Sequence, residues 1–165
     1  MKRQLQTTNI PAPLWRRLAA MAYDSVLVAA IWMVVAFIVL SLFGIDNART
    51  VDGSAVTLDP VYKNILFAAM ILSAWSFFAW FWTHSGQTLG MQAWRIRVQN
   101  AGGAPVTVGQ TVIRFAGAIV SVLVAGCGYW LMLFSPDRKT LHDRLSGSEV
   151  MLVELMEKDG NKPPQ

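Results

Sequence analysis

Long apolar segments dominate the pattern of this chain and predict membrane-spanning helices. Residues 18–43, 61–82 and 112–134 are mainly hydrophobic. About 20 apolar residues, each rising about 1.5 Å, cross a hydrocarbon core about 30 Å thick. The pattern therefore predicts an all-α integral membrane protein with two firm transmembrane helices over the first two segments, and a third hydrophobic helix.

The third hydrophobic helix is glycine-interrupted, because Ala125-Gly126-Cys127-Gly128 lies near its middle. Two glycines so close can break a helix and allow a re-entrant or interfacial hairpin. A spanning helix would instead place Arg138, Lys139 and Arg144 outside, against the tendency of basic residues to stay in the cytoplasm. Both arrangements, re-entrant/interfacial or spanning, stay open, and with them the side of the C-terminus.

An alternating pattern between the second and third apolar segments indicates extended chain. Residues 94–99 alternate between apolar and polar side chains, which is the period of a β-strand. Residues 100–103 supply a turn, and residues 105–108 could form a short second strand. Residues 149–154 are a further strand candidate, able to meet the first if the third helix returns to the same side. We therefore expect a small cytoplasmic β patch.

The chain divides into three parts by composition. Residues 1–13 are a cytoplasmic tail, since Pro11 and Pro13 discourage helix. Residues 14–155 form the membrane domain. Residues 156–165 are rich in charge and proline, which is typical of a disordered tail.

Composition and charge agree with a membrane protein. The chain is 54% hydrophobic and only 15% charged, which is too apolar for an ordinary soluble domain of its size. The net charge of +4 comes from basic residues that flank apolar helices, so it indicates a cytoplasmic N-terminus and no nucleic-acid partner. One cysteine and two histidines make a metal site unexpected, and no motif implies a cofactor.

Asp24 is the only residue inside the first apolar segment that is ordinarily charged at neutral pH. A charge at membrane depth costs at least about 2.5 kcal/mol, so such residues usually pair or line a functional path. Arg17 lies seven residues earlier and shares a helix face with Asp24. Two interpretations stay open: a carboxylate that titrates or coordinates a cation, and a structural buried pair with Arg17 or Arg114.

Two loop motifs carry polar side chains. Residues 85–91 hold two glycines and small hydroxyls but lack the lysine of a Walker loop, which favours a packed helix end over a phosphate site. Residues 140–147 contain His142 and Asp143, but adjacent residues cannot orient each other as base and partner, and no nucleophile elbow is present. We expect no enzyme, and expect Asp143 to cap backbone amides or to pair with Arg17, Arg95 or Arg97.

Together these features resemble the RDD family, small bacterial membrane proteins named for one arginine and two aspartates. Arg17, Asp24 and Asp143 match those three positions, with Arg114 and residues 85–91 as further likeness. Ser148-Glu149 stands where the family often has Thr and an apolar residue, which predicts a less buried last strand.

The resemblance implies a multi-pass protein of the bacterial inner (plasma) membrane with a transport role, in which Asp24 exchanges a proton or monovalent cation. Two or three helices can hardly enclose a pathway, so transport would require a homo-oligomer or another membrane subunit. The alternative is a non-transporting scaffold or assembly factor of a larger membrane complex. The lipid bilayer is a partner in either case.

Overall fold

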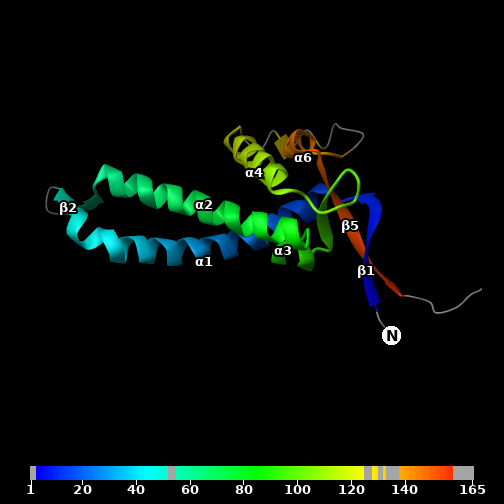
Figure 1. Cartoon of the computed structure of the whole chain (residues 1–165), viewed down its shortest axis with the longest axis horizontal. Coiled ribbons are helices and arrows are strands. Elements are labelled where there is room, and N and C mark those ends of the chain that lie inside the picture. The colour runs from blue at the N-terminus through cyan, green and yellow to red at the C-terminus, as the bar shows by residue number, and fades with distance from the viewer. Residues whose placement is uncertain (1–2, 52–54, 125–127, 130–131, 133–137, 158–165) are drawn as a thin grey trace, which may run out of the picture.

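The computed structural model describes residues 3–51, 55–124, 128–129, 132 and 138–157. Its longest feature is a helical hairpin of α1 (Leu14–Asn47) and α2 (Pro60–His84), joined by the two-stranded ribbon β2 (Ala48–Val51) and β3 (Ala55–Leu58) (Figure 1). Asp59 starts α2, because its side chain accepts a hydrogen bond from the Val61 amide and Pro60 follows it. The hairpin projects away from the rest of the chain.

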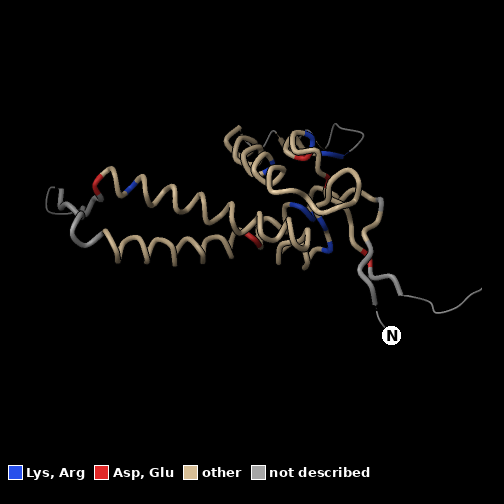
Figure 2. The backbone as a smooth tube through the Cα atoms, in the orientation of Figure 1, with Lys and Arg blue, Asp and Glu red and all other residues tan. Residues whose placement is uncertain are grey.

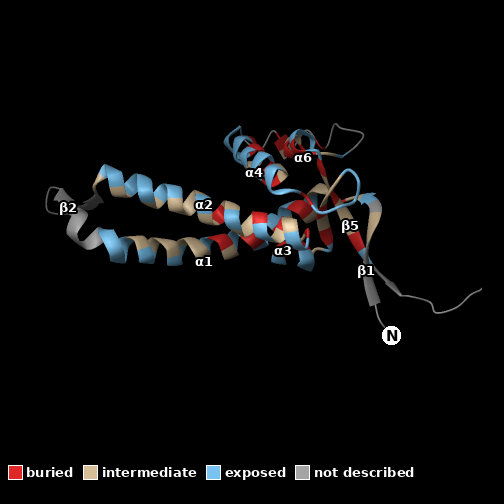
Figure 3. Cartoon of the chain, viewed as in Figure 1, coloured by how far each residue is buried: buried red, intermediate tan, exposed pale blue. Residues whose placement is uncertain are grey.

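Both hairpin helices have the length and composition of membrane spans. Among the described residues, Leu14–Phe43 and Pro60–His84 are long and apolar enough to cross a bilayer. Much of their outward surface is exposed and apolar, as Val26, Met33 and Phe37 of α1 illustrate (Figure 3). The two predicted long apolar helices are confirmed.

A three-stranded antiparallel sheet lies at the end of the hairpin that holds the N-terminus of α1. Its strands are β1 (Arg3–Pro11), β5 (Ser148–Glu157) and β4 (Ile96–Asn100), in the order β1-β5-β4. Val98 pairs with Val150, so the expected meeting of the middle and last strands is confirmed. The side chain of Asn100 accepts bonds from the amides of Gly102 and Ala104, which closes the predicted turn.

Residues 3–11, within the expected tail, form the strand β1, because the open edge of β5 offers backbone partners. Two expectations about extended segments were wrong. Residues 105–108 form no strand, since Thr107 is the N-cap of α4 (Val108–Leu123) and forms a capping box with Gln110. The last strand continues to residue 157, so the tail does not begin at 156, and residues 158–165 lie outside the described part.

The third hydrophobic segment folds back on itself. Helix α4 has 16 residues, about 24 Å at 1.5 Å each, which is shorter than a hydrocarbon core. A Cβ added at Gly128 would lie 2.0 Å from the Ser121 hydroxyl, so the chain returns alongside α4. Near the start of α4, the side-chain amide of Gln110 donates to the Ser146 carbonyl at 3.0 Å. Both flanks of the segment therefore lie at the sheet end, while residues 125–127 lie outside the described part.

The apolar core sits where the hairpin meets the sheet. Two short helices complete this region, α3 (Leu89–Ala93) after α2 and α6 (Leu141–Ser146) before β5. Figure 3 shows the buried residues gathered there, and they include Ala12, Ala20, Trp82, Met91, Ile96, Val98, Val106 and Val150. The polar residues singled out in the sequence surround this core.

Candidate functional site

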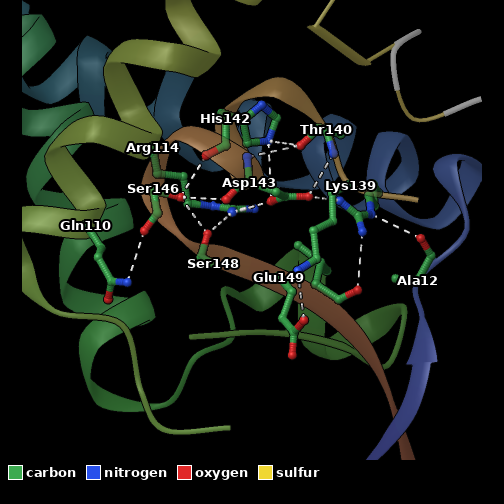
Figure 4. A network of polar contacts seen from close by, with 12 residues as sticks. Ala12, Gln110, Arg114, Lys139, Thr140, His142, Asp143, Ser146, Ser148 and Glu149 are labelled. Carbon is green, nitrogen blue, oxygen red and sulfur yellow. Dashed lines mark hydrogen bonds and ion pairs between the residues drawn. The ribbon is translucent and has the colours of Figure 1, made fainter. Parts of the chain in front are cut away.

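Asp143 is the centre of a buried ion cluster. Its Oδ2 accepts a bond from Arg17 Nη1 at 2.5 Å, and its Oδ1 accepts from Arg114 Nη1 (Figure 4). Asp143 is also the third residue of α6, where its Oδ2 accepts from the Thr140 amide and its own amide donates to the Thr140 hydroxyl. This capping box holds the carboxylate in place at the start of α6. The expectation that Asp143 caps amides or pairs with Arg17 is confirmed.

Arg17 joins the first helix to the sheet. Beyond Asp143, its Nε donates to the Ala12 carbonyl at 3.0 Å, and its Nη2 donates to the carbonyls of Val150 at 3.2 Å and Arg138 at 3.4 Å. A planar guanidinium suits such divergent acceptors, because its five N–H groups lie in a rigid fork. Every nitrogen of Arg17 is therefore used inside the chain.

Arg114 joins α4 to the same carboxylate and to the last strand. Its Nη1 also donates to the Ser148 hydroxyl at 2.7 Å, and its guanidinium carbon lies 5.1 Å from the centre of the Trp82 ring. Ser148 is only 1% exposed, so the prediction of a less buried last strand is wrong at this position. The bond from Arg114 gives the buried Ser148 hydroxyl a polar partner. The Nε of Arg114 is buried and has no hydrogen-bond partner among the described residues.

The cluster holds two guanidinium groups and one carboxylate, all buried. Burial by itself raises the pKa of Asp143, but the charges of Arg114 and Arg17 outweigh it and hold that pKa well below its usual range. Asp143 is therefore ionised at neutral pH. A buried cluster of this kind costs desolvation to form, and removing the carboxylate that both arginines share would leave them without it among the described residues.

His142 lies beside the cluster in its neutral form. It is 5% exposed, its Nε2 lies 3.0 Å from the Thr140 hydroxyl, and its ring meets the ring of Tyr129 edge-on. Burial, together with the charges of Arg114 and Arg17, lowers the pKa of His142 to about 3, and the charge of Asp143 opposes them only in part. The Nδ1 of His142 has no hydrogen-bond partner among the described residues.

The buried histidine predicts a loss of stability in mild acid. The unfolded chain protonates His142 near pH 6.5 and the folded chain only near pH 3, so the free energy of unfolding should fall as the pH drops below about 6.5. One proton corresponds to at most about 1.4 kcal/mol per pH unit. Thermal unfolding of detergent-solubilised protein between pH 7.5 and 4.5 would measure it. His142→Gln should flatten the curve, whereas parallel curves for the two proteins would contradict the prediction.

Asp24 lies apart from the ion cluster and holds the loop after α2. It is 2% exposed, its Oδ2 accepts from the Thr88 hydroxyl at 2.5 Å, and its Oδ1 accepts from the Gly90 amide at 2.9 Å. Thr88 is the N-cap of α3, so the carboxylate sits at the start of that helix. The expected pair of Asp24 with Arg17 or Arg114 is therefore wrong, because both arginines converge on Asp143, and a hydroxyl and an amide satisfy Asp24.

The loop that carries these donors is a packed helix end, as its glycines predicted. A Cβ at Gly90 would lie 2.4 Å from the Ala20 carbonyl oxygen and 2.8 Å from the Asp24 carboxylate. Gly86 has a positive φ of 72°, and a Cβ there would meet the Val98 carbonyl at 2.6 Å. The glycines thus let this loop lie directly on α1 and on β4.

A cavity of about 330 Å³ separates the two polar centres. Most of its wall is apolar and comes from α1, α2 and α4. Its charged lining consists of Arg17, Asp24 and Arg114, with His142 and Tyr129 as further polar residues. Within the described part of the chain, no three His, Cys, Asp or Glu side chains gather into a metal-binding group.

Sequence reasoning missed the uncharged partners of the site. Thr140 and Asp143 stand three apart, which is the spacing of a capping box and could have located the start of α6. Thr88 precedes α3 in the same N-cap position, but no sequence signal connects it with Asp24, 64 residues earlier. Ser148 was visible only as a departure from a pattern, and its partner Arg114 is 34 residues away.

Comparison with known proteins places the chain in a family. A family model described as the RDD family matches residues 11–147. The chain belongs to the RDD family. This RDD chain is also 28% identical over 92 residues to Uncharacterized protein RP437 of Rickettsia prowazekii (strain Madrid E), a match covering 55% of this chain and 51% of that protein. The RDD chain thus spans about half the length of that curated relative, and no solved structure matches it.

The geometry separates the three residues that resemble the RDD signature into two groups. Arg17 and Asp143 bind each other in the ion cluster. Asp24 binds the loop after α2 instead. The arginine and the second aspartate therefore tie α1 to α6, whereas the first aspartate ties α1 to α3.

Proposed function

We propose that this RDD-family chain is a non-transporting membrane scaffold or accessory factor of a larger membrane complex. One observation carries the proposal: Arg17, Asp24 and Asp143 are all engaged in contacts within the chain. Each contact connects segments far apart in sequence. Polar groups used in this way keep a folded surface in one arrangement, which is what an assembly partner would recognise.

The proposed placement is a multi-pass protein of the bacterial inner membrane with its N-terminus in the cytoplasm. Basic residues gather near the sheet end of the hairpin, where Figure 2 shows several blue segments. Arg97 lies in β4, Arg16 donates to the Trp94 carbonyl, and Lys139 pairs with Glu149 of β5. Basic residues favour the cytoplasmic side, which supports a cytoplasmic sheet. The return of the third segment to that end supports the re-entrant or interfacial arrangement over the spanning one.

The hairpin is the surface proposed for a partner membrane subunit or a second copy of the chain. Its exposed large side chains include Val26, Met33, Val34, Phe37 and Leu42 of α1, and Phe67, Leu72 and Trp80 of α2. Such a surface suits both lipid and another apolar helix. The sheet and its ion cluster would hold the hairpin at a constant angle to the membrane surface.

Transport through Asp24 is a second candidate, favoured by the position of this carboxylate in the cavity wall. Arg17 and Arg114 line the same cavity, and two guanidinium groups disfavour a bound alkali cation. A proton binds directly to the carboxylate of Asp24 and does not have to be accommodated in the cavity beside the guanidinium groups. Proton exchange is therefore the form of transport that fits the geometry better.

Asp24→Asn tests the two functions against each other. For a scaffold, we expect Asp24→Asn to lower the free energy of unfolding by about 1–3 kcal/mol, because an amide cannot accept both bonds as a carboxylate does. The variant should also assemble poorly. Vesicles with the wild-type chain should show no proton flux. Thermal unfolding, native electrophoresis and pH-sensitive dyes in proteoliposomes would measure stability, assembly and flux. Asp59→Asn is the matched control, because Asn caps α2 about as well as Asp.

The opposite result would support transport. Wild-type vesicles would then show proton flux, alone or coupled to an alkali cation, and Asp24→Asn would abolish it while assembly and unfolding stayed normal. That combination would overturn the scaffold proposal.

A further inference from the structure

The cavity beside the ion cluster has the composition of a site for an amphipathic ligand. Its volume of about 330 Å³ lies within the ~300–1,000 Å³ of pockets that enclose small ligands. One part of its wall holds the buried side chains Arg17, Arg114 and His142. The rest is apolar and includes Met21, Phe78, Trp82, Phe115, Ala118, Ile119, Val122 and Leu123. A ligand that fits must therefore have a polar and an apolar part.

Two buried nitrogens in the polar part lack a partner among the described residues. They are the Nε of Arg114, a side chain only 4% exposed, and the Nδ1 of His142, which is 5% exposed. An arginine Nε always carries a proton, so it requires an acceptor. A buried donor without an acceptor is unfavourable, and more so when it is charged. Both nitrogens are closed to solvent, so a ligand in the cavity would meet Arg114 through the charge of its guanidinium, which a negatively charged oxygen suits.

The charge of the wall favours an anion. Asp24 is the only carboxylate among the described residues of the lining, and Thr88 and Gly90 already donate to both of its oxygens. Arg114 shares Asp143 with Arg17, so one carboxylate serves two guanidinium groups. The polar part of the cavity therefore presents positive charge that the described residues neutralise only in part.

The apolar part reaches the surface that faces the bilayer. Met21 of α1 and Ile119, Val122 and Leu123 of α4 line the cavity and are also exposed, Leu123 by 79%. Arg17 lies in the first turn of α1, beside Trp15 and Arg16, which is the aromatic and basic pattern of a membrane interface. The polar part of the cavity is therefore near the depth of lipid headgroups, and its apolar part extends toward the acyl chains.

We propose that the cavity binds one acidic phospholipid. The lipid phosphate accepts from Arg114, and one acyl chain lies along the apolar wall between α1 and α4. This assignment goes beyond the scaffold function and does not depend on it. A chain that binds no lipid could still assemble, and a chain that binds lipid could lack an assembly partner.

Native mass spectrometry of the delipidated full chain in detergent tests the proposal. Phosphatidylglycerol, phosphatidylcholine and inorganic phosphate are added separately. We expect one phosphatidylglycerol per chain, held at least about tenfold more tightly than phosphatidylcholine, and no retained inorganic phosphate. Ala118→Phe fills the cavity and should lower phosphatidylglycerol affinity at least tenfold, while Ala116→Phe, on an exposed face of the same helix outside the lining, should leave it unchanged.

A second pair of variants keeps the test decisive if Ala118→Phe fails to fold. Val122→Trp alters the lining, and Val120→Trp places the same ring on an exposed position outside it. Loss of binding in the lining variant alone supports the site. Equal binding of both phospholipids, retention of inorganic phosphate without lipid, equal loss in both variants of a pair, or no loss in either would each overturn it.

Discussion

Asp143→Asn is expected to lower the free energy of unfolding by about 3–5 kcal/mol, the largest single effect in this chain. The substitution removes the carboxylate that Arg17 and Arg114 share and leaves two buried cations without a counter-ion. It also weakens the cap of α6, because an amide replaces the acceptor of the Thr140 amide. Thermal and denaturant unfolding in detergent would measure the loss.

Glu149→Gln is the matched control for this prediction. Glu149 forms an ion pair with Lys139 at 3.4 Å, and the Lys139 side chain is 32% exposed. Pairs in contact with solvent contribute about 0–1 kcal/mol, so the same chemical change should have little effect there. If both variants lost equal stability, the ion cluster would have no special role in holding α1, α4 and α6 together.

Gly90→Ala is expected to detach α3 from α1 and to lower the free energy of unfolding by about 3 kcal/mol, at the upper end of overpacking. The added Cβ would lie 2.4 Å from the Ala20 carbonyl oxygen, and backbone cannot move aside as a flexible side chain can. It would also lie 2.8 Å from Asp24 Oδ1, which would displace the bond from the Gly90 amide. Unfolding and limited proteolysis after residue 85 would measure both effects.

Gly109→Ala is the corresponding control, because a Cβ there has no heavy atom within 4 Å. Gly109 lies in the first turn of α4, where alanine favours helix by up to about 1 kcal/mol. We therefore expect unchanged or slightly greater stability. Similar behaviour of the two variants would show that the contact of Gly90 with α1 does not limit stability.

The features that follow from local pattern were predicted well. The length of the apolar runs in α1 and α2 depends on bilayer thickness alone, and the alternation around Ile96 depends on the pleat of a strand. The pairing of Asp143 with Arg17 was one of three considered, beside Arg95 and Arg97. The sequence supplies these candidate cations but does not say which of them lies near Asp143 in the fold. The strand within the N-terminal tail was not predicted, because its partner β5 is nearly 150 residues away.

The contacts of Asp24 show most clearly where prediction from sequence ended. An apolar helix with one carboxylate implies that a partner exists, since an unpaired charge is costly there. It does not say whether the partner is a cation or a neutral donor. The answer came from the loop after α2, where Thr88 and Gly90 reach Asp24 only because Gly90 has no side chain to keep the backbones apart.

By itself the sequence predicted two helices long and apolar enough to span a membrane, a glycine-interrupted third hydrophobic segment and the RDD signature, because hydrophobicity and periodicity act over short stretches of chain. Only the tertiary structure decided that Asp143 binds both arginines, that Asp24 holds α3, and that a cavity lies between them. Those contacts join segments 29 to 126 residues apart, and hydrogen-bond geometry, unlike hydrophobic pattern, depends on where distant backbones meet.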